Sequence, residues 1–473
     1  MIIRGAGMAT KPTLSQRLMT PVDGASVAVL RIGLGLLIAL EAIGYLAGDE
    51  IARSYLDPAF HFTFEGFDWV QPWPGAGLYL HFGALAVLGL CVAAGLAHRI
   101  TAPLLAISFA YVVLLEKAEY LNHFYAATLF LALIALVPAD RALSLSARRH
   151  PERSPAVPLW AVWILRFQVG VIYAYAGLAK LGTDWLAGEP LATWLGERAD
   201  LAVLGPVLGA SWAGMAFSWG GMALDLLAVP LLLWRRTRMA AFCVLVAFHL
   251  TNAVVFDIGI FPPMMILATT IFFAPDWPRR LWDRIDARAG GPHRVPESLA
   301  AQPGASLADG LPPRARLARL LLAGLAAYAM VQVLVPLRHH LHPGLVHWTE
   351  EGHRFSWQMK LRDKQGSATF LAVDRETGSV RKLDTSRLIT PRQHSRASVR
   401  PDMILQLAHR LAEDERAAGR DVEIRVHALV SLNGRPPRDL VDPERDLSTV
   451  ARGLGPADWI GPEPPPLGGG GEA

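Results

Sequence analysis

The chain has 473 residues, of which 52% are hydrophobic and only 18% are charged. Soluble domains carry about 25% charged residues, so this composition excludes an ordinary soluble domain and is typical of a membrane protein. The formal net charge of +4 does not indicate a nucleic-acid-binding protein, because the arginines lie in loops between apolar runs, where they encode membrane topology.

Residues 1–26 are polar and are expected to form a cytoplasmic N-terminal segment. Nine apolar runs follow, each near the ~20 residues that a spanning helix needs. They lie at 27–46, 77–97, 100–115, 122–138, 158–180, 211–234, 239–256, 258–274 and 318–338. The predicted fold class is therefore membrane α-helical, with about nine transmembrane helices in a membrane domain over 27–338.

The positive charges of the loops predict the orientation of these helices. Lys and Arg gather in the N-terminal segment and in alternate loops, above all between residues 279 and 319. The intervening loops carry only Arg53, Lys117 and Arg198. Because positive residues favour the cytoplasmic side, we expect a multi-pass protein of the cytoplasmic (inner) membrane with a cytoplasmic N-terminus. Nine crossings then place the C-terminal part outside the cytoplasm.

After residue 338 the composition becomes that of a soluble protein, and 339–456 is predicted to be a small extracytoplasmic α+β domain. Residues 367–373 and 380–383 alternate between apolar and polar side chains around a Glu-Thr-Gly turn, which predicts a hairpin. Residues 402–419 have the pattern of an amphipathic helix, and 422–432 that of a strand.

Two segments lack the pattern of a packed structure. Residues 285–313 are rich in Ala, Gly, Pro and Ser and are expected to form a flexible inner loop. Residues 457–473 contain a Pro-rich and then a Gly-rich stretch and are expected to be a disordered tail.

Ionisable side chains inside apolar runs are costly and are therefore candidates for function. His123, Lys180, His249 and His339 come from four separate runs, and the predicted orientation places all of them near the outer face. We interpret this convergence as a pocket between helices. An amine in an apolar pocket can give up its proton near neutral pH and act as a general base.

Each candidate also has an ordinary structural explanation. A single histidine often serves only as a hydrogen-bonded packing residue, and a lysine at the end of a membrane helix often reaches the interface with its long stem. Four further charges are interpreted as paired structural groups: Arg31, Glu41, Arg166 and Asp225. The run from His339 to His342 lacks the spacing of Cys or carboxylate ligands, so no metal is expected.

The stretch 165–186, with Tyr-Ala-Tyr-Ala-Gly-Leu-Ala-Lys at its centre, resembles the core of the vitamin K-dependent γ-glutamyl carboxylases. Further matches to this family follow in the same order along the chain. They lie at 115–125, 219–226, 248–252, 258–261, 274–279, 336–339, 348–349, 356–359 and 441–447. The resemblance covers roughly residues 27–450.

The resemblance implies the reaction. These enzymes oxidise reduced vitamin K with O2 to an epoxide, and the strong base formed on the way removes a γ-proton from a glutamate side chain. The resulting carbanion captures CO2. The partners implied are a glutamate-containing protein or peptide, the membrane lipid and the quinone. Because the Arg- and Ala-rich sequence is typical of a high-GC bacterium, a menaquinol-type quinone is expected.

The resemblance also implies roles for particular residues. Lys180 matches the base that deprotonates the hydroquinone, and Asn122 lies beside the quinone. His123 matches the histidine of the carboxylation half, while His249 and His339 match further histidines needed for activity. The contacts to the glutamate substrate are expected from three residues: Trp348, His353 and Trp357.

The chain departs from the family's pattern at two places, and two alternatives stay open. Ala179 replaces the first member of a lysine doublet, and His353 with Phe355 stand in a segment that is otherwise rich in tyrosine. The C-terminal region is shorter than in animal members, which puts propeptide recognition in doubt. One alternative is a hydroquinone epoxidase that does not carboxylate glutamate, and the other is a non-enzymatic membrane module of the same fold.

Overall fold

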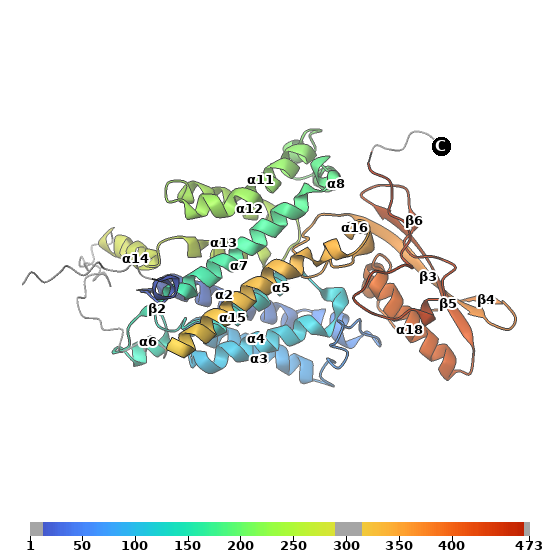
Figure 1. The fold of residues 1–473 in the computed structure, drawn as a ribbon, viewed down its shortest axis with the longest axis horizontal. Coiled ribbons are helices and arrows are strands. Elements are labelled where there is room, and N and C mark those ends of the chain that lie inside the picture. The colour runs from blue at the N-terminus through green and yellow to red at the C-terminus, as the bar shows by residue number, and fades with distance from the viewer. Residues whose placement is uncertain (1–12, 289–314, 468–473) are drawn as a thin grey trace, which may run out of the picture.

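The computed structural model describes residues 13–288 and 315–467 (Figure 1). Among these residues, seven helices are long and apolar enough to cross a membrane. They are α2 (Ala25–Ala47), α3 (Gly77–Ala94), α4 (His98–Leu115), α7 (Leu159–Leu178), α11 (Ala213–Leu233), α12 (Arg238–Val255) and α15 (Ala315–Leu337). The membrane α-helical class is therefore confirmed.

The two remaining predicted runs form shorter apolar helices. These are α5 (Asn122–Leu136) and α13 (Phe261–Thr269), the latter continued by a 3-10 turn to Phe272. All nine predicted runs are thus helical. The number of crossings stays a prediction, because these two helices are shorter than the ~20 residues that span a bilayer.

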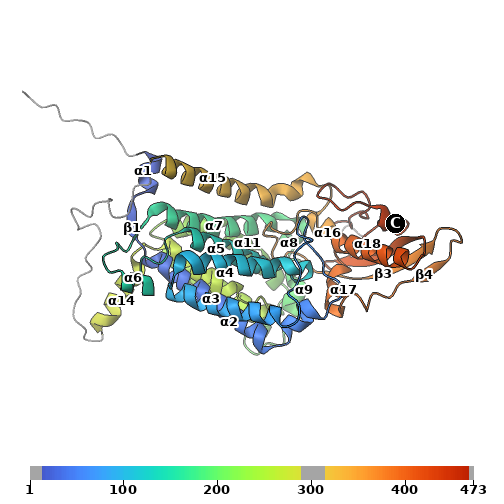
Figure 2. The ribbon, with the colours of Figure 1, turned by 90° about the horizontal axis from the view of Figure 1, so that it is seen from below.

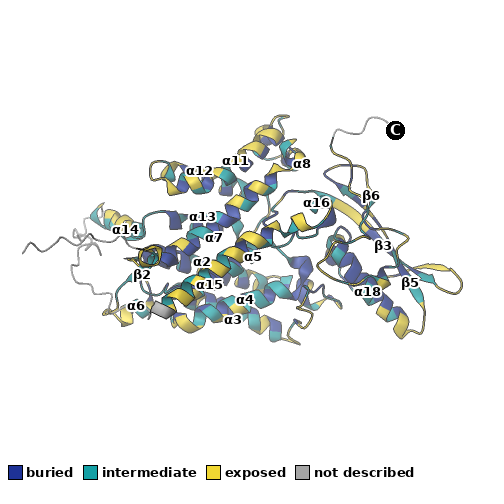
Figure 3. Ribbon diagram, viewed as in Figure 1, coloured by how far each residue is buried: buried dark blue, intermediate teal, exposed yellow. Residues whose placement is uncertain are grey.

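Close backbone contact holds the first helices together. A Cβ atom on Gly35 of α2 would lie 2.5 Å from the carbonyl oxygen of Gly89 on α3, so the two helices touch without intervening side chains. Small residues serve this purpose in membrane bundles, where water does not drive helices together. The outer faces of α11, α12 and α15 carry exposed residues (Figure 3). On α15 these are the apolar Leu320, Met330 and Leu334, as expected of a surface facing lipid.

The two arginines inside the bundle bind backbone carbonyl oxygens and not carboxylates. Arg31 is fully buried and donates to the carbonyl oxygens of Ala93, Ala139 and Leu143, at 2.7–3.2 Å. Arg166 donates to two carbonyl oxygens after α13. The interpretation of these arginines as charge pairs between helices is therefore wrong, because backbone carbonyl oxygens at and after helix ends accept their hydrogen bonds.

A four-stranded antiparallel sheet follows the last apolar helix, at one end of the bundle (Figure 2). Its strand order is β4-β3-β5-β6. The strands are β3 (Lys364–Asp374), β4 (Val380–Lys382), β5 (Val422–Leu432) and β6 (Arg438–Asp439). The helices α17 (Pro391–Ala397) and α18 (Pro401–Ala417) belong to the same part. β3 and β4 form a hairpin at the predicted residues, and β5 has the predicted bounds.

Alternating burial explains how this sheet packs. In β5 the side chains of Ile424, Val426 and Ala428 are buried, while those between them are more exposed. Leu407 and Leu411 of α18 belong to the same buried cluster. The sheet therefore has one covered face, as the period-2 pattern of the sequence predicts.

The predicted tail at 457–473 is ordered over its first part. Ile460 pairs with Val441 in a β-bridge, Trp459 is buried, and the carbonyl oxygen of Pro465 accepts a hydrogen bond from Arg435. The prediction of disorder is therefore wrong for 457–467, because these contacts outweigh the Pro-rich composition. Residues 468–473 and most of the predicted inner loop lie outside the described residues; 285–288 complete α14 (Trp277–Arg288).

Candidate active site

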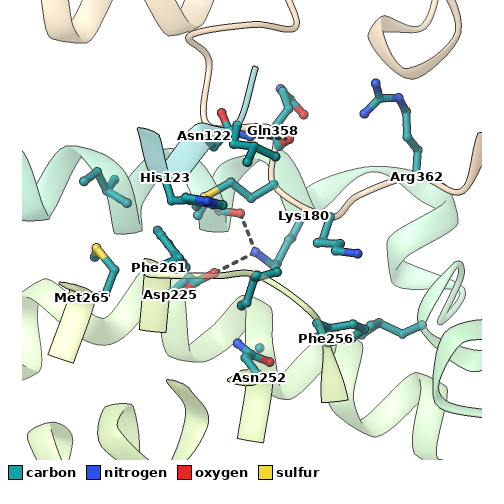
Figure 4. A pocket seen from close by; sticks show the side chains of 18 of the residues that line it. Asn122, His123, Lys180, Asp225, Asn252, Phe256, Phe261, Met265, Gln358 and Arg362 are labelled. Carbon is teal, nitrogen blue, oxygen red and sulfur yellow. Dashed lines mark hydrogen bonds and ion pairs between the residues drawn. The ribbon is translucent and has the colours of Figure 1, made fainter. Parts of the chain in front are cut away.

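A cavity of about 440 Å³ lies between the membrane helices and the segment that leads into the sheet (Figure 4). Its two ends differ in character. The membrane end is apolar and is lined by Ile172, Phe217, Phe248, Phe261 and Met265. The other end is cationic and is lined by Arg354, Lys360, Arg362, Arg396 and Arg400. Such a cavity suits two ligands, one apolar and one anionic.

Lys180 lies in the apolar wall, in the 3-10 turn that ends α7. Its Nζ donates to Asp225 Oδ2 of α11 at 2.7 Å and to the carbonyl oxygen of Ala176 at 3.1 Å. Gly177 allows this pair to form, because a Cβ atom there would lie 2.7 Å from Leu226 and push α11 away. The sequence indicated Lys180 as a candidate, whereas Asp225 was interpreted only as a structural charge.

His123 and Asn122 begin α5 and also line the cavity, as predicted (Figure 4). Asn122 Nδ2 donates to the carbonyl oxygen of Gln358 at 3.2 Å, and its Oδ1 accepts from the hydroxyl of Tyr120 at 3.1 Å. Gly259 approaches the ring of His123 with a positive φ of 51°, a conformation that favours glycine. The start of α5 therefore lines the cavity and also contacts the segment that contains Gln358.

His249 lines the cavity and its protonation follows from its neighbours. The hydroxyl of Thr269 donates to the carbonyl oxygen of Met265 at 2.7 Å. The Tyr173 hydroxyl lies 3.1 Å from Thr269 Oγ1 and 2.8 Å from His249 Nε2. A hydroxyl has one proton, so Tyr173 donates to Thr269 and accepts from His249 Nε2.

This assignment leaves a lone pair on Nδ1 of His249. That atom is buried and has no hydrogen-bond partner among the residues that the structure describes. A buried polar atom gains stability from a hydrogen-bond partner, so Nδ1 is available to a ligand in the cavity. The ligand group that fits it is a hydroxyl donor.

Three of the predicted residues lie beside the cavity and do not line it. The ring of His339 turns back to its own segment, where Nδ1 donates to the carbonyl oxygen of Pro336 at 2.8 Å. Trp348 is buried under the sheet, with Nε1 donating to the carbonyl oxygen of Gly461. Trp357 stacks on Tyr125. The predicted convergence therefore holds for His123, Lys180 and His249 and is wrong for His339, because a 3-10 turn after α15 redirects that ring.

A buried charge network supports the cationic end of the cavity. Glu350 accepts from Arg362 Nε at 2.7 Å and Nη2 at 2.5 Å, and Lys364 lies 3.5 Å away. Arg362 Nη1 also donates to Nε2 of His353 at 2.7 Å. Burial alone would raise the pKa of Glu350, but the positive charges of Arg362 and Lys364 hold it well below its usual range.

The same burial acts on the basic members of this network. It lowers the pKa of His353, and the positive charge of Arg362 lowers it further, so this histidine is neutral and accepts a hydrogen bond from Arg362. Burial lowers the pKa of Lys364 to about 7. Sequence reasoning found His353 but missed Arg362, Arg400 and Lys360. The run of charges at 360–364, which begins three residues after Trp357, was the available signal.

Two family models match this chain. Residues 19–277 match the HTTM domain, and residues 317–465 match the lumenal domain of the vitamin K-dependent gamma-carboxylases. Because the first match covers more than half of the chain, this is an HTTM-domain membrane protein. With both domains in order, it belongs to the vitamin K-dependent γ-glutamyl carboxylase family, as its sequence indicated. It is a multi-pass membrane protein with a lumenal-type C-terminal domain. None of the solved structures matches the chain.

Proposed function

We propose that this protein is an integral-membrane γ-glutamyl carboxylase. It converts glutamate side chains of a protein substrate to γ-carboxyglutamate with CO2 and O2, coupled to epoxidation of reduced vitamin K of the menaquinol type. The observation that carries this proposal is the single cavity with two opposite ends: an apolar end with Lys180 and Asp225, and a cationic end with Arg362.

The apolar end fits a reduced naphthoquinone. Its aromatic and aliphatic walls suit the ring, and Nδ1 of His249 is an acceptor for a ring hydroxyl. Asn122 lies on the same wall. When bound, the hydroquinone would react with O2, and this reaction would form the strong base.

The pair of Lys180 and Asp225 can take up the proton that must leave the hydroquinone. A proton passes from the ammonium to the carboxylate across 2.7 Å, and the free amine then accepts the hydroxyl proton. The pair is neutral as a whole before and after the first transfer. This matters in an apolar wall, where a net charge without compensation is expensive.

The cationic end fits the glutamate side chain. Lys360, Arg362 and Arg400 line it and can hold a carboxylate with charge-assisted hydrogen bonds. His123 lies between the two ends and serves the carboxylation half. Three predicted residues do not line the cavity and support the residues that contact the substrates: His339, Trp348 and Trp357.

The predicted orientation agrees with this division. With nine crossings, a cytoplasmic N-terminus and location in the inner membrane, the cavity lies at the outer leaflet. The quinone then arrives from the lipid and the protein substrate from the extracytoplasmic side.

The test is a reaction with detergent-purified protein, reduced vitamin K, O2, labelled bicarbonate and a glutamate peptide. We expect equal amounts of epoxide and fixed label, and loss of both in Lys180→Met. The exposed Lys382→Met is the matched control. Label fixed without Lys180 would refute the assigned mechanism.

Other outcomes decide between the alternatives. Epoxide without fixed label, across several peptides, would support the hydroquinone epoxidase. Absence of both products in a protein that is folded would support the non-enzymatic membrane module.

A further inference from the structure

A buried turn of the sheet contacts two segments that each contribute a residue to the cavity. Asn433 follows β5 and is only 5% exposed. Its Nδ2 donates to Asp184 Oδ2 at 2.6 Å, and its Oδ1 accepts from the backbone N–H of Asp363 at 2.8 Å. Its own N–H donates to the carbonyl oxygen of Asp363. One amide side chain therefore bridges two segments that are distant in the sequence.

Each bridged segment carries a residue of the cavity. Asp184 lies in α8 (Thr183–Leu186), which directly follows the turn that bears Lys180. Asp363 directly follows Arg362. The bridge therefore runs from the segment of the proposed base to the segment of the proposed glutamate-binding residues.

Arg435 completes the bridge on the membrane side. Its Nη1 and Nη2 donate to the two carboxylate oxygens of Asp184 at 2.7 and 2.6 Å, and its Nε donates to the carbonyl oxygen of Pro465. Paired donors of this kind fix orientation as well as distance. Together with Asn433 they give the Asp184 carboxylate three hydrogen-bond donors, so α8 is held to the sheet by a buried and directional contact.

The choice of asparagine fits this position. Asn433 has a φ of 51°, which asparagine tolerates better than most residues. The bridge also needs a donor toward Asp184 and an acceptor toward Asp363 in one short side chain. An aspartate would offer only acceptors when ionised and would place a second carboxylate against Asp184.

We propose that Asn433 is a positioning residue that keeps the two half-reactions in register. It holds the Lys180 segment and the Arg362 segment at a fixed separation. The strong base that forms from the hydroquinone at the membrane end then reaches the glutamate side chain held at the cationic end. When the register is lost, the base takes its proton from water, and epoxide forms without carboxylation. This inference rests on the proposed function and adds a coupling residue to it.

The test measures epoxide and fixed CO2 in the same reaction for wild type, Asn433→Ala and Asn433→Asp. We expect the ratio of epoxide to fixed CO2 to rise roughly tenfold or more in both variants, because a displacement of ~1 Å can cost about 10²-fold in rate. A purely structural role would lower both products together and leave the ratio unchanged. An unchanged ratio in both variants would overturn the proposal.

Arg452→Gln is the matched control. Arg452 also joins the sheet part to the membrane part, through Asp68, Glu65 and Thr63, but unlike Asp184 and Asp363 none of these residues directly precedes or follows a residue that lines the cavity. We expect this variant to keep the wild-type ratio. A raised ratio here would show that any loosening of the two parts uncouples the reaction, and would refute a special role for Asn433.

Hydrogen exchange tests the bridge without activity. In Asn433→Ala we expect peptides covering 180–187 and 360–365 to lose protection together, and in Arg452→Gln neither to do so. Loosening of one segment alone, or of none, would overturn the proposal. If wild-type protein makes neither product, the proposed function fails, and the exchange result still decides whether Asn433 couples the segments.

Discussion

The two ends of the cavity hold their charges in different ways. In the membrane end, Lys180 and Asp225 form an isolated pair surrounded by apolar side chains. In the cationic end, Glu350, Arg362 and Lys364 share a dense network with several partners each. The isolated pair can move a proton without disturbing its neighbours. The network cannot, because each member fixes the others, and it is therefore suited to holding a ligand still.

The largest expected effect breaks the isolated pair. Asp225→Asn keeps the shape but removes the group that takes the proton of Lys180, so epoxide formation should fall by about 10²–10⁴-fold. Initial rates at saturating hydroquinone measure this loss. Asp225→Glu should recover part of it, and Asp458→Asn, at an exposed position, should have no effect. Wild-type rates in Asp225→Asn would remove this carboxylate from the mechanism.

The next effect contrasts the stability of the two ends. Glu350→Gln leaves Arg362 and Lys364 buried without their carboxylate and should cost about 3–5 kcal/mol of stability. Replacing both members of the isolated pair, as Lys180→Met with Asp225→Leu, should cost far less, because no buried charge remains. Thermal unfolding in detergent compares the variants. Equal losses for both would show that the two ends do not differ in this respect.

A smaller effect separates the substrates. The ammonium of Lys360 lies over the rings of Trp194 and Phe256, at 5.2 and 5.4 Å from their centroids, and lines the cationic end. Lys360→Met should raise KM for the glutamate peptide by about tenfold, the loss of one hydrogen bond to a charged group. KM for the hydroquinone should stay unchanged. A rise in the second constant would mean that the two ends are not separate binding sites.

The last effect is a pH dependence of stability at the cationic end. Burial lowers the pKa of Lys364 to about 7, whereas an exposed lysine titrates near about 10.4. Between these values the unfolded chain binds a proton that the folded chain has released, so stability rises with pH. Unfolding midpoints from about pH 7 to 10 should show a slope of ~1 kcal/mol per pH unit attributable to this group. Lys364→Met should lack that slope, and Lys382→Met should retain it.

Much of the fold could be predicted because apolar runs and alternation are local signals. The bounds of α2 and β5 follow from such patterns to within a few residues. The sequence could also predict three site residues, Lys180, His123 and His249. Ionisable residues in apolar runs are rare, and the loop charges indicate the depth of these residues in the membrane. The place of His339 could not be predicted, since the direction of its ring depends on a turn that the apolar pattern does not reveal.

The remaining site residues depend on contacts between distant segments. The partner of Lys180 is 45 positions away, and Asn433 meets Asp184 across 249 positions. No local pattern distinguishes Asp225 from a structural charge or Asn433 from an ordinary turn residue. The role of Asp225 follows from the helix packing at Gly177, and the role of Asn433 follows from its hydrogen bond to Asp184 in α8.

The bridge through Asn433 has a consequence for how this architecture can be recombined. The two family matches, 19–277 and 317–465, invite chimeras that exchange the outer domain between relatives. Asp184 belongs to the first match, and Asn433 and Arg435 to the second. A transplanted domain would therefore need to carry a compatible turn, so we expect the two parts to be exchangeable only as matched sets.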